Sequence, residues 1–238
     1  MKILKSIYEN EVEVKEISVL RSLFIIIMFT LIPGIINFLS TFIMILIDEN
    51  ISIGSVMIIA GIILIPVHMI IIIMVGKKYT QKDIIKINDK KVKINNKDFL
   101  YVFLIIIGYI LIREAILFDV LSQFEGPISE DDIDFFIDNA ETIEVVIFGF
   151  LMYFQTLITA PIFEELLFRG IILNGLLNKY KNSSKKAIIY SAMVFGLVHL
   201  NIPQGINAFI GGIILGFIYC YTKSMKLSIF AHFINNLI

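Results

Sequence analysis

The sequence predicts an all-α membrane protein, a polytopic transmembrane helical bundle of about seven to eight membrane helices. Three observations lead to this prediction. Of the 238 residues, 58% are hydrophobic, and the mean hydropathy of +0.87 is too high for a soluble domain. The apolar residues form long runs. The charges are sorted into the loops between these runs, and the formal net charge of -1 indicates no nucleic-acid partner.

The N-terminal half contains three apolar runs. Two of them, Leu23–Ile47 and Ile51–Val75, exceed the roughly 20 residues that a helix needs to cross a bilayer, and Phe99–Ile112 approaches that length. The charged segment before the first run, and the length of that run, are unlike a cleavable signal with its roughly 7 to 15 apolar residues. We therefore expect the first run to remain as a membrane helix.

The C-terminal half contains four further apolar runs. They are Ile143–Phe163, Ala187–Leu200, Ile206–Tyr221 and Leu227–Ile238. The last would form a helix only about 18 Å long, so it is expected to end inside the bilayer. In the run before it, Gly212 and Gly216 have the G-x-x-x-G spacing that allows close helix packing.

Basic and acidic residues alternate between successive loops. The basic loops contain Lys77, Lys78, Lys82, Lys86, Lys90, Lys91, Lys93 and Lys97, then Lys179, Lys181, Lys185 and Lys186, and finally Lys223 and Lys226. The intervening loops contain Asp48 and Glu49, and then Asp119, Glu125, Glu130, Asp131, Asp132, Asp134, Asp138 and Glu141. By the positive-inside rule the basic loops and the N-terminus are cytoplasmic. The many Ile, Lys and Asn residues favour a bacterial cell membrane.

Two helices bring ionisable side chains to the same depth. Glu164, within the stretch FEELLFRG, lies fifteen residues before Lys179, and His199 lies thirteen residues after Lys186. Each is therefore about 20 Å from the cytoplasmic edge. Ionisable groups at such depth are costly unless they are paired or hydrated, so they usually face a cavity and mark a functional route. A polar network that only holds the bundle together is the competing interpretation.

The last apolar run adds two polar side chains. His232 and Asn236 are four residues apart, so they project from one face of a helix, about 9 to 15 Å from the cytoplasmic edge. We expect all four side chains to meet in one cavity.

The FEELLFRG stretch also contains a predicted ion pair. Glu165 and Arg169 are four residues apart and face the same side of a helix, whereas Glu164 lies about 100° around the helix from Glu165. We therefore expect Arg169 to neutralise Glu165 and to leave Glu164 available for chemistry.

These residue types suggest a hydrolytic site. A glutamate and a histidine, here Glu164 and His199, can activate a water as general base, and His232 with Asn236 can donate hydrogen bonds to a developing oxyanion. This set is sufficient for peptide-bond hydrolysis without a covalent nucleophile.

A zinc site is an alternative interpretation of the same residues. Glu164, His199 and His232 could hold the ion and leave one position open for water, but the sequence has no H-E-x-x-H motif. The remaining histidine, His68, follows Pro66 in an apolar run with no acid nearby. We interpret His68 as a packed, hydrogen-bonded side chain rather than a catalytic one.

Three ordered motifs resemble those of the CAAX prenyl endopeptidase and bacteriocin-processing (CPBP, or Abi) family of intramembrane proteases, which includes the Ras-converting endopeptidases. The family motif E-E-x-x-x-R corresponds to Glu164, Glu165 and Arg169, F-x-x-x-H to Phe195 and His199, and H-x-x-x-N to His232 and Asn236. The resemblance covers residues 143 to 238, and the N-terminal helices match only in hydropathy.

The resemblance implies a role for each matched residue. Glu164 and His199 would activate the water, and His232 and Asn236 would form the oxyanion hole. Glu165 and Arg169 would support the site, and Phe195 would pack against the imidazole one turn later. The family picture is a metal-independent hydrolysis, so no cofactor is favoured. The printed sequence ends two residues after Asn236, so we expect the oxyanion hole to be less rigid.

We expect one helical domain in three parts. Residues 1–21 form a cytoplasmic N-terminal segment, residues 22–142 carry the first membrane helices, and residues 143–238 form the catalytic transmembrane region. The second part includes a basic cytoplasmic loop, 76–98, and an acidic external loop, 119–142. Within the acidic loop we expect either a short interfacial helix or a solvated loop.

Three functional hypotheses follow from the sequence. The favoured one is an intramembrane endopeptidase that cuts a peptide or membrane-protein substrate in the lipid bilayer. The second is a non-catalytic protein, such as a bacteriocin immunity factor or a scaffold, that retains the protease fold. The third, a transporter or proton relay, is disfavoured because no pair of Gly/Pro-broken segments recurs in the two halves.

Overall fold

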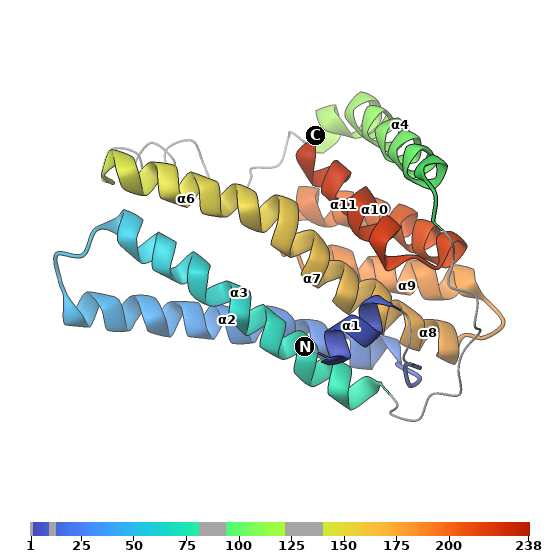
Figure 1. Ribbon diagram of the computed structural model, residues 1–238, viewed down its shortest axis with the longest axis horizontal. Coiled ribbons are helices and arrows are strands. Elements are labelled where there is room, and N and C mark those ends of the chain that lie inside the picture. Colours follow the sequence, from blue (N-terminus) through green and yellow to red (C-terminus); the bar gives the residue numbers. More distant parts are fainter. Residues whose placement is uncertain (1, 10–12, 81–93, 122–139) are drawn as a thin grey trace.

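The computed structural model describes residues 2–9, 13–80, 94–121 and 140–238 (Figure 1). All regular elements in these ranges are helices, as the sequence predicts, apart from one isolated β-bridge between Val14 and Thr80. Most of the basic loop, and the short helix expected in the acidic loop, lie outside the described residues.

Four helical stretches of the described part are long and apolar enough to cross a membrane. They are Val19–Ile47, Ile53–Tyr79, Thr142–Lys179 and Ile202–Thr222. Together with the shorter helices they form the bundle of an integral membrane protein.

Helices α2 (Val19–Ile47) and α3 (Ile53–Tyr79) form an antiparallel hairpin. Each begins at a serine N-cap, because the Ser18 and Ser52 hydroxyls accept hydrogen bonds from backbone N–H groups three residues later. The cap at Ser18 starts the first membrane helix at Val19. This is three residues before residue 22, the start of the membrane helices predicted from the sequence.

One continuous helical stretch carries the FEELLFRG sequence. It runs through α6 (Thr142–Phe154), the π-helix η1 (Gln155–Thr159), α7 (Ala160–Leu167), the π-helix η2 (Phe168–Leu173) and α8 (Asn174–Lys179). The two π segments flank α7 on both sides. Such segments are rare and occur often at functional sites, because the wider turn frees backbone groups and changes the direction of the side chains that follow.

The remaining helices lie on one side of this stretch (Figure 1). They are α4 (Asn96–Leu121), α9 (Ser184–Leu197), α10 (Ile202–Thr222) and α11 (Met225–Leu237). The close packing predicted from the glycine spacing is present between α9 and α10. A Cβ atom on Gly212 would lie 3.1 Å from the Phe195 ring and 3.2 Å from Ala192.

The buried apolar side chains form two clusters. The larger one joins the N-terminal residues, α2, α3, the stretch from α7 to α8, and α9. The smaller one joins α4, α10 and α11, with an edge-on contact between Phe99 and Phe230, whose ring centroids are 5.1 Å apart. Helix α11 therefore packs one face on α4 and turns its other face, which carries His232, toward α7.

The N-terminal segment packs against the same long helical stretch. Helix α1 (Lys2–Tyr8) buries Ile7 against the backbone of Gly170. Further along, the Ile17 N–H donates to the Gly175 carbonyl at 3.0 Å, and the Asn178 amide donates to the Val14 carbonyl at 2.6 Å. The segment predicted as a cytoplasmic extension is thus a fixed part of the bundle.

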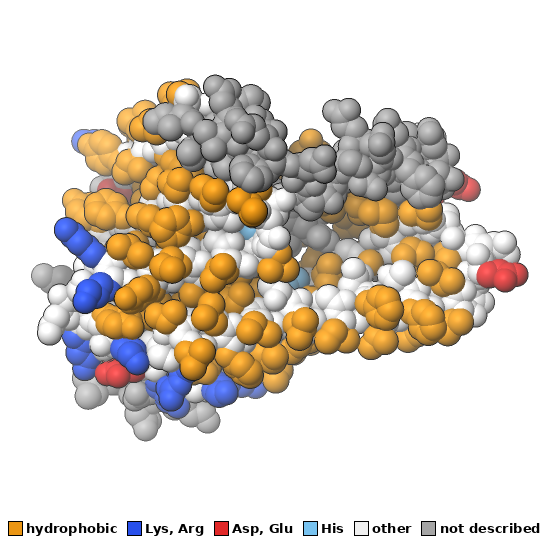
Figure 2. All heavy atoms as spheres, turned by 180° about the vertical axis from the view of Figure 1, so that it is seen from behind, with side chains coloured by type: hydrophobic (Ala, Val, Ile, Leu, Met, Phe, Trp, Pro, Cys, Tyr) orange, Lys and Arg blue, Asp and Glu red, His pale blue; other side chains and the backbone are white. Residues whose placement is uncertain are grey.

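The charges are separated along the long axis of the molecule. Most of the face shown in Figure 2 is hydrophobic, with Lys and Arg side chains gathered at one end, while the charged side chains visible at the opposite end are acidic. This sorting agrees with the alternation of loops in the sequence. The cytoplasmic assignment of the basic end follows from the positive-inside rule and stays a prediction.

A Gly196→Ala variant is expected to destabilise the protein by about 1 to 3 kcal/mol, as overpacking of a tight contact does. The added Cβ atom would lie 2.7 Å from the Gly205 carbonyl oxygen and 3.2 Å from Phe209 Cβ. Because the obstacle is backbone, α9 must move away from α10. Thermal unfolding in detergent measures the effect, with Gly108→Ala as the control, since nothing lies within 4 Å of that Cβ position. Equal midpoints for the two variants would refute this packing argument.

Candidate active site

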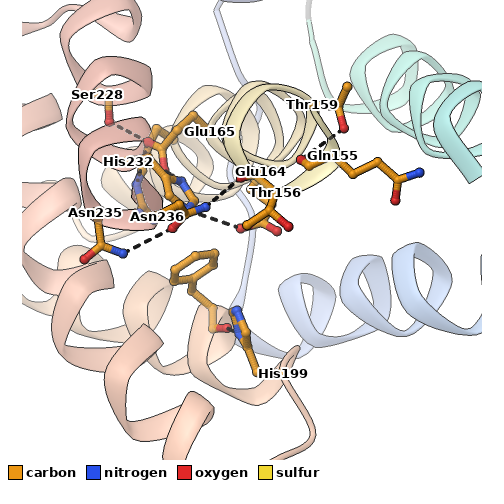
Figure 3. A network of polar contacts seen from close by, with 12 residues as sticks. Gln155, Thr156, Thr159, Glu164, Glu165, His199, Ser228, His232, Asn235 and Asn236 are labelled. Atoms are coloured by element: carbon orange, nitrogen blue, oxygen red, sulfur yellow. Dashed lines mark hydrogen bonds and ion pairs between the residues drawn. The ribbon is translucent and has the colours of Figure 1, made fainter. Parts of the chain in front are cut away.

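Helix α7 presents two adjacent glutamates to different surroundings. The Glu165 side chain is completely buried, whereas 20% of the Glu164 side chain is exposed. The roughly 100° between neighbouring residues of a helix accounts for this difference, as the sequence predicts. Figure 3 shows both carboxylates with the surrounding polar groups.

Glu165 is the anchor of a buried polar cluster. Its Oε2 lies 3.1 Å from Arg169 Nε and accepts a hydrogen bond from the Ser228 hydroxyl. Its Oε1 lies 3.1 Å from His232 Nδ1. The predicted ion pair with Arg169 is therefore present, and both of its side chains have no solvent exposure.

The Arg169 guanidinium is held by charge rather than by directed hydrogen bonds. Its distance to Glu165 is that of an ion pair, but among the described residues none of its three side-chain nitrogens has a partner with hydrogen-bond geometry. It also lies over the Phe195 ring, with 5.2 Å from Cζ to the ring centroid. A cation over an aromatic face gains electrostatic stabilisation, which strengthens in a desolvated site.

His232 connects the two glutamates. Its Nδ1 faces Glu165, and its Nε2 lies 3.7 Å from Glu164 Oε2. The Glu165 carboxylate can only accept, so Nδ1 is the donor in the first contact. The ring is thereby oriented with Nε2 toward the partly exposed carboxylate of Glu164.

His199 lies at the end of α9, where the chain turns toward α10. Its Nδ1 contacts the Phe195 carbonyl at 3.0 Å, one of the carbonyls that a helix C-terminus leaves without a partner. The Phe195 ring lies edge-on to both histidines, with centroid distances of 5.3 Å to His199 and 5.8 Å to His232. Phe195 therefore contacts both imidazoles. Among the described contacts His199 forms no direct hydrogen bond or ion pair with Glu164.

Asn236 is hydrogen-bonded to the backbone of η1. Its amide donates to the Thr156 carbonyl at 3.0 Å (Figure 3). The π pattern explains why this carbonyl is available, because the Ala160 N–H bonds to the carbonyl of Gln155, five residues back. The next donor in that pattern would be Pro161, which has no N–H. The second N–H of the Asn236 amide is left for another acceptor.

The donors of the alternative zinc site do not assemble. Among the described residues no group of three or more His, Cys, Asp or Glu side chains is close enough to hold a metal ion, and this includes the set Glu164, His199 and His232. The described part of the chain therefore offers no fitted ligand set for zinc in this arrangement.

The sequence did not reveal two features of the site. Ser228 bonds to Glu165 from the same face of α11 as His232, and its i, i+4 spacing was the only signal. The second feature is a cavity of about 110 Å³ beside Glu164, which is also lined by His68 of α3. The sequence suggested a packed histidine there, and the structure brings it to the same cavity as the glutamate.

Comparison with known proteins supports a membrane peptidase. Residues 146–238 match the family model described as "Type II CAAX prenyl endopeptidase Rce1-like". A relative from Bacillus subtilis (strain 168), named "Putative membrane peptidase YdiL", is 34% identical over 86 residues, which are 36% of this chain and 34% of the relative. The family resemblance is thus confirmed for the part of the chain that carries the three motifs.

The chain spans about a third of the length of this curated relative. No solved structure matches the chain.

Proposed function

We propose that this chain, whose C-terminal part matches that family, is an intramembrane endopeptidase that hydrolyses a peptide or membrane-protein substrate. One observation carries the proposal: Glu164 is a partly exposed carboxylate at the edge of a buried, charge-balanced cluster. A purely structural ion pair needs one acid for Arg169, and Glu165 already supplies it. Glu164 is therefore the acid left for chemistry.

In this proposal Glu164 acts as the general base. A water gives one proton to the Glu164 carboxylate while its oxygen attacks the carbonyl carbon of the scissile peptide bond. The resulting tetrahedral intermediate carries a negative charge on the former carbonyl oxygen. As the C–N bond breaks, Glu164 returns the proton to the leaving amine. The carboxylate is then restored, and no covalent enzyme intermediate forms.

In this proposal His232 and Asn236 stabilise the oxyanion. The Nδ1–H of His232 is directed at Glu165, so in this proposal the ring donates to the oxyanion from Nε2 when it carries a proton on both nitrogens. The ion pair of Arg169 with Glu165 lowers the cost of burying this cluster.

His199 and Phe195 complete the proposed site. The Nδ1–H of His199 donates to the Phe195 carbonyl, so its Nε2 is an acceptor that can orient the attacking water or the substrate amide. Phe195 contacts both imidazoles and lies against Arg169.

We propose that the protein lies in a bacterial cell membrane, with its N-terminus on the cytoplasmic side.

The His199→Ala variant tests the proposal. Purified protein in liposomes is incubated with a peptide mixture and a single-span membrane protein, and mass spectrometry identifies the new chain ends. We expect cleavage by the unaltered chain and a loss of about 10²-fold in His199→Ala, the lower range for an acid–base group. Met193→Ala, on the lipid-exposed face of α9, is the matched control and should keep full activity.

Two other results would point to different functions. If the unaltered chain cuts nothing but binds a partner equally well with and without His199, it is a non-catalytic immunity or scaffold protein. If cleavage is abolished by a chelator and restored by zinc, a metal reaction replaces the glutamate mechanism. We expect a chelator to leave the cleavage rate unchanged.

A further inference from the structure

The cavity beside Glu164 lies between α2, α3 and the π segment η1. Its polar lining side chains are Glu164, His68, Gln155 and Thr159. The remaining lining is apolar and includes Phe29. The cavity thus places a second histidine, from a different helix, on the side of Glu164 that the three sequence motifs do not reach.

The His68 ring is held in one orientation. Its Nδ1 lies 2.9 Å from the Leu64 carbonyl, one turn earlier on α3. Because a carbonyl only accepts, Nδ1 carries the proton and Nε2 carries the lone pair. The ring also packs on Phe29 of α2, with centroids 4.7 Å apart.

His68 and His199 are held in the same way. In both, Nδ1 contacts the carbonyl four residues earlier, and the ring packs against a phenylalanine. Both therefore present Nε2 as an acceptor. The difference is their position, because the lining of the cavity at Glu164 includes His68 and not His199.

The size and lining of the cavity suit water. A water occupies about 30 Å³ in the liquid and needs two to four polar partners when buried, so 110 Å³ accommodates about three waters. The Gln155 side-chain amide donates to the Gly61 carbonyl, and the Thr159 hydroxyl donates to the backbone carbonyl of Gln155. Among the polar lining side chains, Glu164 and the neutral His68 ring, through its Nε2, are then the strongest acceptors.

We propose that this cavity supplies the hydrolytic water and that His68 is the positioning residue that orients it. The inference rests on the proposed function. A water between two acceptors donates one hydrogen to Glu164 and the other to His68 Nε2, so both of its lone pairs are free to attack. During attack the first proton moves to Glu164, and the hydrogen bond to His68 is retained.

The activity test compares two substitutions of similar size. His68→Leu keeps an apolar side chain against Phe29 but removes the acceptor, whereas His68→Gln keeps an acceptor oxygen. We expect kcat to fall about 10- to 100-fold in His68→Leu with KM within about twofold, and His68→Gln to retain most of the activity. Equal rates in the two variants, whether normal or reduced, would overturn the proposal.

The second measurement does not depend on catalysis. The chain has three histidines, so ¹⁵N-histidine labelling gives three pairs of ring-nitrogen signals that single substitutions assign. We expect His68 to be neutral, protonated on Nδ1, with magnetisation transfer from water to the ring. That transfer should weaken in Glu164→Leu. A dry His68 ring overturns the inference, even if cleavage is observed, whereas a hydrated ring in a chain that cuts nothing refutes only the proposed function.

Discussion

Glu164→Gln is expected to lower the rate of peptide cleavage by about 10² to 10⁴-fold, the contribution of a positioned general base. The amide has the same shape as the carboxylate but cannot accept the proton of the attacking water. The amide can keep the contact with His232 Nε2, which is now 3.7 Å from the carboxylate. The fold should therefore survive, and the loss should appear in kcat.

The matched control neutralises a different acid. Glu114 is 51% exposed and pairs with Arg113 at 2.8 Å, outside the proposed site. Glu114→Gln should cleave at the normal rate. Initial rates for both variants, measured in the same liposomes, decide the question. If Glu164→Gln keeps more than about a tenth of the normal rate, Glu164 is not the general base.

Arg169→Met is expected to destabilise the fold by about 3 to 5 kcal/mol, the usual effect of removing one partner of a buried ion pair. Methionine retains much of the arginine stem but leaves Glu165 as a buried carboxylate without its cation. Ser228 and His232 still contact the Glu165 carboxylate. The same two side chains also have to keep the geometry of the proposed active site. We expect lower thermal stability in detergent and loss of cleavage together.

A double variant separates charge from packing. Glu165→Gln combined with Arg169→Met removes both charges, so it should recover most of the lost unfolding free energy while remaining poorly active. Arg113→Met breaks the exposed pair with Glu114 and should change stability by less than about 1 kcal/mol. If Arg169→Met is as stable as Arg113→Met, the buried pair does not stabilise the fold.

Local spacing predicted the parts of the site that depend on a single helix. The partnership of Glu165 with Arg169 follows from their i, i+4 spacing, which the π segment η2 does not disturb. The helical class follows from composition and run length. The roles assigned to Glu164, His199, His232 and Asn236 stay predictions.

Features that join different helices could not be predicted in this way. His68 has no acid nearby in sequence. The acid that lines the same cavity, Glu164, belongs to α7. The contact of Asn236 with Thr156 depends on the π register of η1 and on the missing N–H of Pro161. Hydropathy does not reveal a π segment, since one extra residue in a turn leaves the apolar run unchanged.

The packing of Ile7 on Gly170 and of Ile17 on Gly175 has a consequence for biogenesis. Ile7 and Ile17 leave the ribosome more than 150 residues before the glycines on which they pack. They must wait at the membrane until the helix carrying Glu164 has been inserted. Contacts so distant in sequence form slowly. Residues that are made before this helix are therefore among the last to reach their final position.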